Sequence, residues 1–281
     1  MKITPPHILV TLLTLCAAPF ILAADTQSVA SFEKTITKKV GYQYLLSLPT
    51  GYDAASDKKW PVILFLHGSG ERGSDVWKVA IHGPPKLIRG PIATPPPAPE
   101  PSTKAPPAPE TVEARALREQ SAAFLKANFI VVSPQCPAGK SWDDDGVLAL
   151  LDEITVNHKT DPTRHYLTGL SMGGFGTWSV AMKFPERFAA IVPICGGGNP
   201  TDVRRSSREK KVPLTSLGVW VFHGAKDPTV ALAESETMVA ALKKAGVTDL
   251  QLTVYPEAKH DSWTETYNNP ELYAWLLKHQ R

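Results

Sequence analysis

The chain has little cysteine, and no part of it has the ligand spacing of a metal site. Three cysteines occur in 281 residues, and only Cys136 and Cys195 lie beyond the N-terminal apolar stretch. Two cysteines are too few for a disulfide scaffold. Each ends an apolar run, which predicts a buried thiol, and a disulfide between the two is the alternative. Because His, Cys and carboxylates are not clustered, we expect no metal and no cofactor.

The chain also lacks strong charge of one sign and a long apolar run. The formal net charge is +3 without a basic stripe, so we expect no nucleic-acid partner. The apolar stretch from Ile8 to Leu22 is shorter than the ~20 residues of a membrane-spanning helix. One early lysine and Ala23-Ala24 flank it, as in a secretory signal peptide. We predict a signal peptide at residues 1–24, a secreted or periplasmic protein and no stable membrane span after cleavage. Leu22 fits the cleavage site poorly, which leaves an uncleaved anchor as the alternative.

Residues 90–110 differ in composition from the rest of the chain. They read GPIATPPPAPEPSTKAPPAPE and contain no aromatic residue. Such a segment forms neither a helix nor a paired strand and is typical of an extended loop or arm. We interpret it as an insertion in one catalytic domain spanning residues 25–281. A rim over the site and a tether to a polymer are the functional alternatives.

Short apolar runs alternate with segments of helical pattern. The runs are PVILFLHG (61–68), FIVVSPQC (129–136), HYLTGLS (165–171), AAIVPICGG (189–197), VWVFHGAKD (219–227) and LQLTVYPEAKH (250–260). Helical patterns include residues 146–158, with Leu148, Leu151 and Ile154 on one face, and residues 231–246. This alternation predicts an α/β fold with a mainly parallel, doubly wound sheet. Residues 31–49 alternate around Lys39–Gly41 and predict an N-terminal antiparallel hairpin.

A serine stands between glycines where the run HYLTGLS gives way to GGFGTWSVAMKF. The pattern Gly169-x-Ser171-x-Gly173 is common by itself. Here it falls on a strand-to-helix turn, which exposes a side chain at the carboxyl edge of the sheet, where ligands bind in such folds. Glycine is expected at both positions because the turn brings strand and helix backbones close. The context therefore predicts that Ser171 is a nucleophile.

A serine nucleophile needs a base, and the base needs an acid that orients it. His260 follows the last predicted strand and lies at the same edge, whereas His67 and His223 each precede a glycine and suit turn roles. Asp227 follows the preceding strand. The chain order Ser171, Asp227, His260 is that of the α/β-hydrolase arrangement. Asp202 is the weaker alternative for the acid, and Asp261 adjoins His260 too closely to bond to it well.

The oxyanion of an acyl-transfer intermediate needs backbone donors. The N–H of Met172, directly after the nucleophile, is one candidate. The second is the N–H of Gly68 or Ser69 in the turn that follows VILFLHGSG. An ordinary glycine-rich turn is the alternative interpretation of HGSGERG.

Several segments together resemble one known family. They are LFLHGSGERG, HGPPKLI, VVSPQCP, LTGLSMGGFGTW, FAAIVPICGGG, VWVFHGAKD and HDSWTETYNNPELYAWLL. This set is similar to secreted α/β-hydrolases known as predicted peptidases or phospholipase/carboxylesterase-like proteins, related to dienelactone-hydrolase-like and feruloyl-esterase-like carbohydrate esterases. The resemblance runs from about Tyr42 to the C-terminus. It implies serine esterase chemistry, with Ser171, Asp227 and His260 as the triad and Met172 in the oxyanion hole. The chain departs from the family in the Pro/Ala-rich segment and has no large cap before Asp227, which predicts an open site.

The expected substrate is an ester, feruloyl or acyl, on plant polysaccharides, by analogy with the family. Trp142 and Trp263 are candidate substrate-binding residues, with packing as the alternative. The run Asp143-Asp144-Asp145 is expected to cap a helix rather than bind a cation. A serine peptidase, a polyester or lipid hydrolase and a non-catalytic binding protein on the same scaffold remain as alternative functions.

Overall fold

The computed structural model describes residues 29–90 and 110–281. The predicted signal peptide and residues 91–109 of the predicted insertion lie outside the described residues. The chain divides into a short N-terminal unit ending at Lys39 and a compact unit from Val40 to Arg281. Residues 29–39 contain neither helix nor strand. Of the helices in the described ranges, none has both the length and the apolar character needed to cross a membrane.

The compact unit is built on a seven-stranded sheet with strand order β1-β3-β2-β4-β5-β6-β7. The pair β1 and β3 is antiparallel, and the other neighbours are parallel. The strands are β1 (Gln43–Ser47), β2 (Trp60–Leu66), β3 (Ile130–Gln135), β4 (Thr160–Leu170), β5 (Ala190–Ile194), β6 (Gly218–Gly224) and β7 (Leu250–Tyr255). Because β2 to β7 all run in one direction, their carboxyl ends meet at one edge of the sheet, where loops can carry a site.

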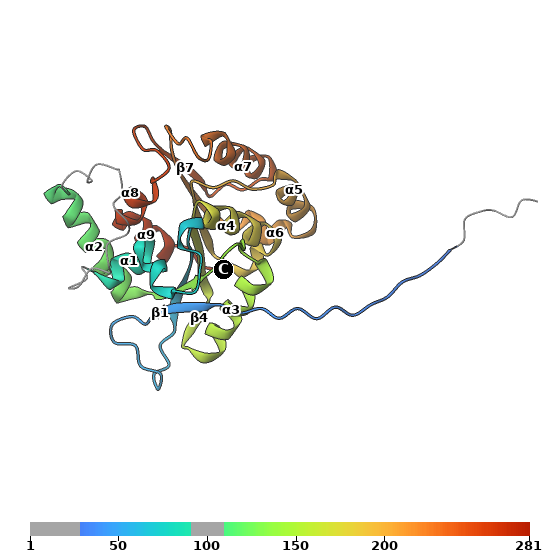
Figure 1. The fold of residues 1–281 in the computed structure, drawn as a ribbon, viewed down its shortest axis with the longest axis horizontal. Coiled ribbons are helices and arrows are strands. Elements are labelled where there is room, and N and C mark those ends of the chain that lie inside the picture. Colours follow the sequence, from blue (N-terminus) through green and yellow to red (C-terminus); the bar gives the residue numbers. More distant parts are fainter. Residues whose placement is uncertain (1–28, 91–109) are drawn as a thin grey trace, which may run out of the picture. The chain divides into compact units, whose positions relative to one another are not determined.

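Helices cover both faces of this sheet (Figure 1). The α-helices are α1 (Gly83–Arg89), α2 (Val112–Asn128), α3 (Asp144–Asn157), α4 (Met172–Lys183), α5 (Pro200–Glu209), α6 (Lys211–Thr215), α7 (Leu232–Ala245), α8 (Trp263–Asn268) and α9 (Pro270–Leu277). Short 3₁₀ turns are η1 (Ser69–Glu71), η2 (Val76–Ile81) and η3 (Pro185–Arg187). The predicted α/β, doubly wound architecture is confirmed.

Two apolar clusters fill the layers on either side of the sheet. Along β2, Val62 and Leu64 join the cluster with α3, α4, α5 and α7, whereas Ile63 and Phe65 join the cluster with α1, α2, α8 and α9. Successive strand residues point to opposite faces, so a strand buried on both faces is apolar at every position. All seven residues of β2 are buried accordingly.

The six predicted strands and the two predicted helices are present. Leu148, Leu151 and Ile154 of α3 are buried as a single face. Helix α7 ends at Gly246, whose φ of 91° is the left-handed conformation that glycine adopts readily. Asp143 caps α3 by accepting a hydrogen bond from the Asp145 N–H. The Asp143-Asp144-Asp145 run therefore serves the helix N-terminus, as predicted.

The predicted N-terminal hairpin is wrong. No strand precedes β1 in the described chain, and β1 pairs with β3, where Leu45 lies opposite Ser133. The backbone of β1 finds its partner in the main sheet, so a local partner strand is not required. Residues 31–39 carry Glu33, Lys34, Lys38 and Lys39. They offer too little apolar surface to offset the entropy of ordering a second strand.

A buried histidine in β4 makes the stability of the fold sensitive to acid. His165 is 5 % exposed, and burial together with nearby Arg187 lowers its pKa to about 4. In the unfolded chain the histidine binds a proton near pH 6.5, whereas in the folded chain it does so only near pH 4. The free energy of unfolding therefore falls as the pH is lowered from about 6.5 towards 4.

We predict that His165→Gln reduces this sensitivity. Between pH 7 and pH 4.5, the free energy of unfolding should fall by about 2 kcal/mol less in the variant than in the wild type. Urea unfolding at both pH values measures the difference. Equal losses in the two proteins would contradict it.

Candidate active site

Ser171 occupies the turn between β4 and α4 in a strained backbone conformation. Its φ is 52° and its ψ is −117°, which non-glycine residues adopt only when the surroundings impose it. Two backbone hydrogen bonds hold the turn: the Ser171 N–H donates to Ile194 O at 3.0 Å, and Ser171 O accepts from the Phe175 N–H at 3.0 Å. The turn therefore places the serine side chain at the carboxyl edge of the sheet.

The glycines around Ser171 allow strand and helix to approach closely. A Cβ on Gly173 would lie 1.9 Å from Leu66 O, and a Cβ on Gly169 would lie 2.3 Å from Gly173 O. Gly174 is equally constrained, with Ile194 O at 2.5 Å from its Cβ position. The predicted reason for glycine at positions 169 and 173 is confirmed.

The structure brings the three predicted triad residues together. His260, in the loop after β7, has its Nε2 2.9 Å from Ser171 Oγ and its Nδ1 2.7 Å from Asp227 Oδ2. An ionised carboxylate only accepts hydrogen bonds, so Nδ1 carries the proton, and Nε2 accepts from the serine hydroxyl. This arrangement can take a proton from Ser171 as its oxygen attacks an electrophile.

Asp227 is the most enclosed member of the set. Its side chain is 0 % exposed, and Oδ1 accepts hydrogen bonds from the N–H groups of Thr229 (2.8 Å) and Val230 (3.0 Å). Burial acts to raise its pKa, but the hydrogen bonds from His260, Val230 and Thr229 outweigh burial and hold the pKa below the usual value. Asp227 is therefore an anion that can offset positive charge on the imidazole.

The alternative acids and bases lie in other roles. Asp202 is in the first turn of α5, 3.8 Å from Arg205. His67 is buried, its Nδ1 donates to Gly68 O at 2.6 Å, and its Nε2 accepts from the Cys136 N–H. Burial lowers the pKa of His67 to about 4, so the ring is neutral at pH 7. His223 bonds to Ser235 and Val230. Both histidines fix loops, as their glycine neighbours predicted.

The predicted oxyanion donors lie beside the serine. Met172 is the first residue of α4, where a backbone N–H has no acceptor within its own helix. Gly68 approaches from the end of β2, and a Cβ on it would lie 3.6 Å from Ser171 Cβ. Ser69 follows in η1 and is exposed. Met172 and the Gly68–Ser69 turn thus flank the nucleophile.

Glu71 is a component of this turn that the sequence analysis missed. It is 7 % exposed, and its Oε2 is 3.3 Å from the position of a Cβ on Gly68. Its carboxyl oxygens lie 3.8 Å from His67 Nδ1 and 3.8 Å from His82 Nε2. Burial raises the pKa of Glu71. The segment HGSGERG directly follows a buried strand and contains one acidic residue, Glu71. That residue was the feature of the sequence from which a carboxyl group near the turn could have been predicted.

The two predicted tryptophans lie on different sides of the triad. Trp142 lines a hollow of about 480 Å³ together with Ser171, Met172 and Phe175, and its Nε1 donates to His67 O at 3.1 Å. Trp263 does not line this hollow. Its ring packs edge-on against His260 with ring centroids 5.3 Å apart. Trp142 is therefore placed to contact a group bound at Ser171, and Trp263 is placed to hold the histidine.

Cys136 and Cys195 are buried free thiols, and the alternative of a disulfide between them is wrong. Within the described residues, Cys195, Asp227 and His260 form the one group close enough to suggest a metal site, with ligand atoms within 4.8 Å. Burial raises the pKa of Cys195 to about 12, and a protonated thiol is a poor ligand. Asp227 and His260 already bond to each other, so this donor set does not fit a metal ion.

Comparisons with known proteins find hydrolases among similar sequences and structures. A model of the Dienelactone hydrolase family matches residues 138–272. A thermostable esterase of known structure is 28 % identical with a TM-score of 0.62, covering 85 % of this chain and 59 % of its own. The feruloyl esterase module of Clostridium thermocellum, at 17 % identity and a TM-score of 0.54, covers 83 % of this chain and 82 % of its own and shows the shared fold.

Two curated proteins share shorter segments. Poly(3-hydroxyalkanoate) depolymerase C of Paucimonas lemoignei is 35 % identical over an alignment of 86 residues. The alignment covers 25 % of this chain and 21 % of that protein. The bifunctional acetylxylan esterase/xylanase XynS20E of Neocallimastix patriciarum is 29 % identical over an alignment of 115 residues, which covers 38 % of this chain and 16 % of that protein. The chain thus spans about a fifth of the length of these relatives. Its fold is that of the α/β-hydrolases, and its similarities are to esterases and related hydrolases.

The close approach at Gly173 gives a test of the turn. We predict that Gly173→Ala lowers the melting temperature by about 5 °C or more, because the new methyl group overlaps Leu66 O and costs about 2 kcal/mol or more. Gly70→Ala is the matched control, since a Cβ there meets nothing within 4 Å. Thermal unfolding followed by circular dichroism measures both. Similar melting temperatures for the two variants would contradict the packing argument.

Proposed function

We propose that the protein is a secreted serine carboxylic ester hydrolase that acts through an acyl-enzyme. The observation that carries this proposal is the hydrogen-bonded series Ser171, His260 and Asp227 at the strained turn, with distances of 2.9 Å and 2.7 Å. The similarity to esterases supports the reaction class. The N-terminal sequence pattern supports secretion, with residues 1–24 as a cleaved signal peptide.

The proposed reaction has two halves. Ser171 Oγ attacks the ester carbonyl carbon while His260 Nε2 accepts the hydroxyl proton, and Asp227 stabilises the imidazolium. The negative charge on the carbonyl oxygen faces the Met172 N–H and the Gly68–Ser69 turn. His260 then protonates the departing alcohol. In the second half, water loses a proton to His260, attacks the acyl group and releases the acid, which restores Ser171.

The proposed substrates are feruloyl or acyl esters of plant polysaccharides. Trp142 and Phe175 give the hollow beside Ser171 aromatic walls suited to an aryl or acyl group. A relative is an acetylxylan esterase/xylanase, which supports an ester carried on a polysaccharide. Polyester hydrolysis is the second candidate, favoured by the 35 % identity to a polyhydroxyalkanoate depolymerase.

We predict that Asp227→Asn lowers kcat/KM on p-nitrophenyl acetate by about 10⁴-fold, because the imidazole loses the carboxylate that fixes its tautomer. Asp202→Asn is the matched control and should leave kcat/KM within about twofold of the wild type, since Asp202 lies in the first turn of α5 with its carboxylate 3.8 Å from Arg205. Initial rates measure both. A comparable loss in both variants, or in neither, would contradict the proposed role of Asp227.

The acyl preference has its own test. Methyl ferulate and p-nitrophenyl acetate should be hydrolysed with comparable kcat/KM, and Ser171→Ala should abolish both reactions. Turnover of the acetate alone would refute the feruloyl assignment and leave the esterase. Turnover of poly(3-hydroxybutyrate) without either small ester would favour the second candidate.

A further inference from the structure

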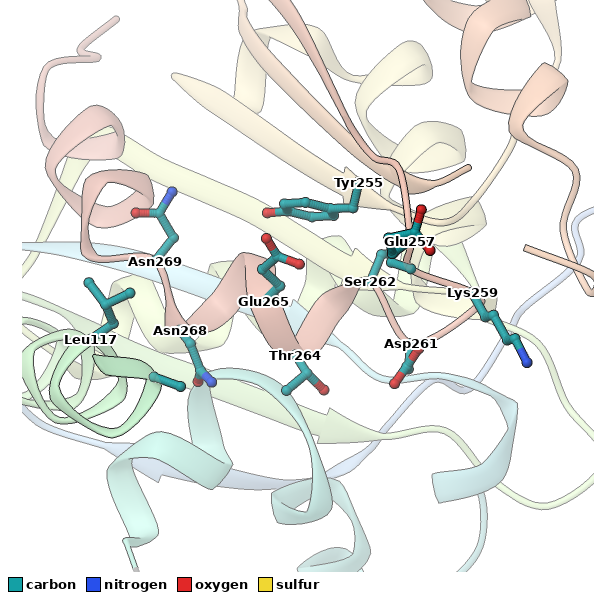
Figure 2. Close-up of a pocket in the computed structure, with 12 residues that line it drawn as sticks. Leu117, Tyr255, Glu257, Lys259, Asp261, Ser262, Thr264, Glu265, Asn268 and Asn269 are labelled. Atoms are coloured by element: carbon teal, nitrogen blue, oxygen red, sulfur yellow. The ribbon is translucent and has the colours of Figure 1, made fainter. Parts of the chain in front are cut away.

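A second and larger hollow lies behind the loop that carries His260. Its volume is about 720 Å³, within the range of about 300–1,000 Å³ that small-molecule sites occupy. Helix α2, the end of β7, the following loop and α8 form its walls (Figure 2). In Figure 2, Tyr255 lies above Glu265 of α8, while Asn269 and Lys259 stand towards opposite ends.

This hollow lies against the chain segment that follows the triad histidine. Asp261 and Ser262, which line it, directly follow His260. Thr264 and Asn268 line it too, and the same two residues line a smaller hollow with Trp263 and His82. Trp263, which lines the smaller hollow, packs edge-on against the His260 ring. Trp142 and Phe175 lie in the separate hollow beside Ser171.

The side chains in the hollow match a neutral sugar. Tyr255 is half-buried, its hydroxyl bonds to Thr266, and its ring stacks on Phe222 with centroids 6.1 Å apart, which fixes an aromatic wall. Thr264, Glu265 and Asn268 offer a hydroxyl, a carboxyl and an amide. A rigid aromatic surface attracts the C–H face of a pyranose, and planar polar groups bond to its hydroxyls.

Carboxyl groups outnumber basic groups among the residues that line the hollow. Its acidic residues are Glu257, Asp261 and Glu265, and its basic residue is Lys259. Glu257 is paired with Lys226. Among the residues that line the hollow, Asp261 and Glu265 then remain beside Lys259. Partial burial raises the pKa of Glu265 above its usual value. Uronate chains would meet like charge here, whereas neutral chains would not.

We propose that this hollow is a subsite for a neutral pyranose unit of the chain whose ester is cleaved at Ser171. The inference rests on the proposed esterase function and names the part of the substrate that the hollow holds. The subsite holds the polysaccharide on the α8 side while the acyl group occupies the hollow of Trp142 and Phe175. We expect the sugar to be held equally in the ground state and the transition state, so that loss of the subsite raises KM and leaves kcat unchanged.

The kinetic test uses the double variant Thr264→Ala/Glu265→Ala, here called the α8 variant. The matched control is Glu236→Ala/Thr237→Ala, the α7 variant, which changes two exposed residues of α7. Substrates are a feruloylated xylo-oligosaccharide and methyl ferulate. In the α8 variant, the ratio of KM for the oligosaccharide ester to KM for the methyl ester should rise at least about fivefold over the wild-type ratio. The α7 variant should keep the wild-type ratio. An unchanged ratio in the α8 variant would overturn the proposal.

A binding test separates this inference from the esterase proposal. The full-length Ser171→Ala variant is titrated separately with xylohexaose, cellohexaose and a galacturonate hexamer. Isothermal titration calorimetry measures the binding of each. Binding of either neutral chain, weakened at least about fivefold by Thr264→Ala/Glu265→Ala, supports the subsite even if no ester is hydrolysed. Absence of binding by both neutral chains, binding that the α8 substitutions leave unchanged, or binding of the galacturonate alone would overturn it.

Discussion

The site depends on the contact between the start of α4 and the end of β2. Gly173 lies so close to Leu66 O that only a hydrogen fits between them, and Ser171 accepts a positive φ because this contact and the bond to Ile194 O leave no relaxed alternative. The same contact brings Gly68, at the end of β2, beside Ser171. Nucleophile and oxyanion turn are thus positioned by one backbone approach.

Electrostatics at the site follow from burial. Asp227 stays anionic although its side chain has no exposed surface, because His260 and two backbone N–H groups bond to it. Around the Gly68–Ser69 turn, burial keeps His67 and His82 neutral, with the pKa of each lowered to about 4, and raises the pKa of Glu71. The carboxylate of Asp227 lies behind His260, on the side away from Ser171 Oγ, and the two buried histidines are neutral at pH 7.

Most of the fold and the triad could be predicted from the sequence, because the relevant signals are local. Strands buried on both faces are continuously apolar, as in β2, and the order Ser171, Asp227, His260 places each residue after a strand at one edge. The hairpin could not be predicted correctly, since the partner of β1 is β3, some 90 residues further along the chain. Glu71 and the hollow at Tyr255 were missed because their burial and neighbours arise only when distant segments pack together. Trp142 and Trp263 were found as candidates, but their separation on either side of the triad is a tertiary property.

The most direct test of the account is the identity of the covalent intermediate. The protein would be mixed with p-nitrophenyl acetate, quenched in acid within the first turnovers, digested and examined by mass spectrometry. We expect one acetyl group on the peptide that contains Ser171. In His260→Gln, once it has been acylated by the same activated ester, water attack is impaired, and the acetyl group should be lost more slowly than in the wild type. An acetyl group on another residue, or release of nitrophenol with no acylated peptide at any time, would contradict it.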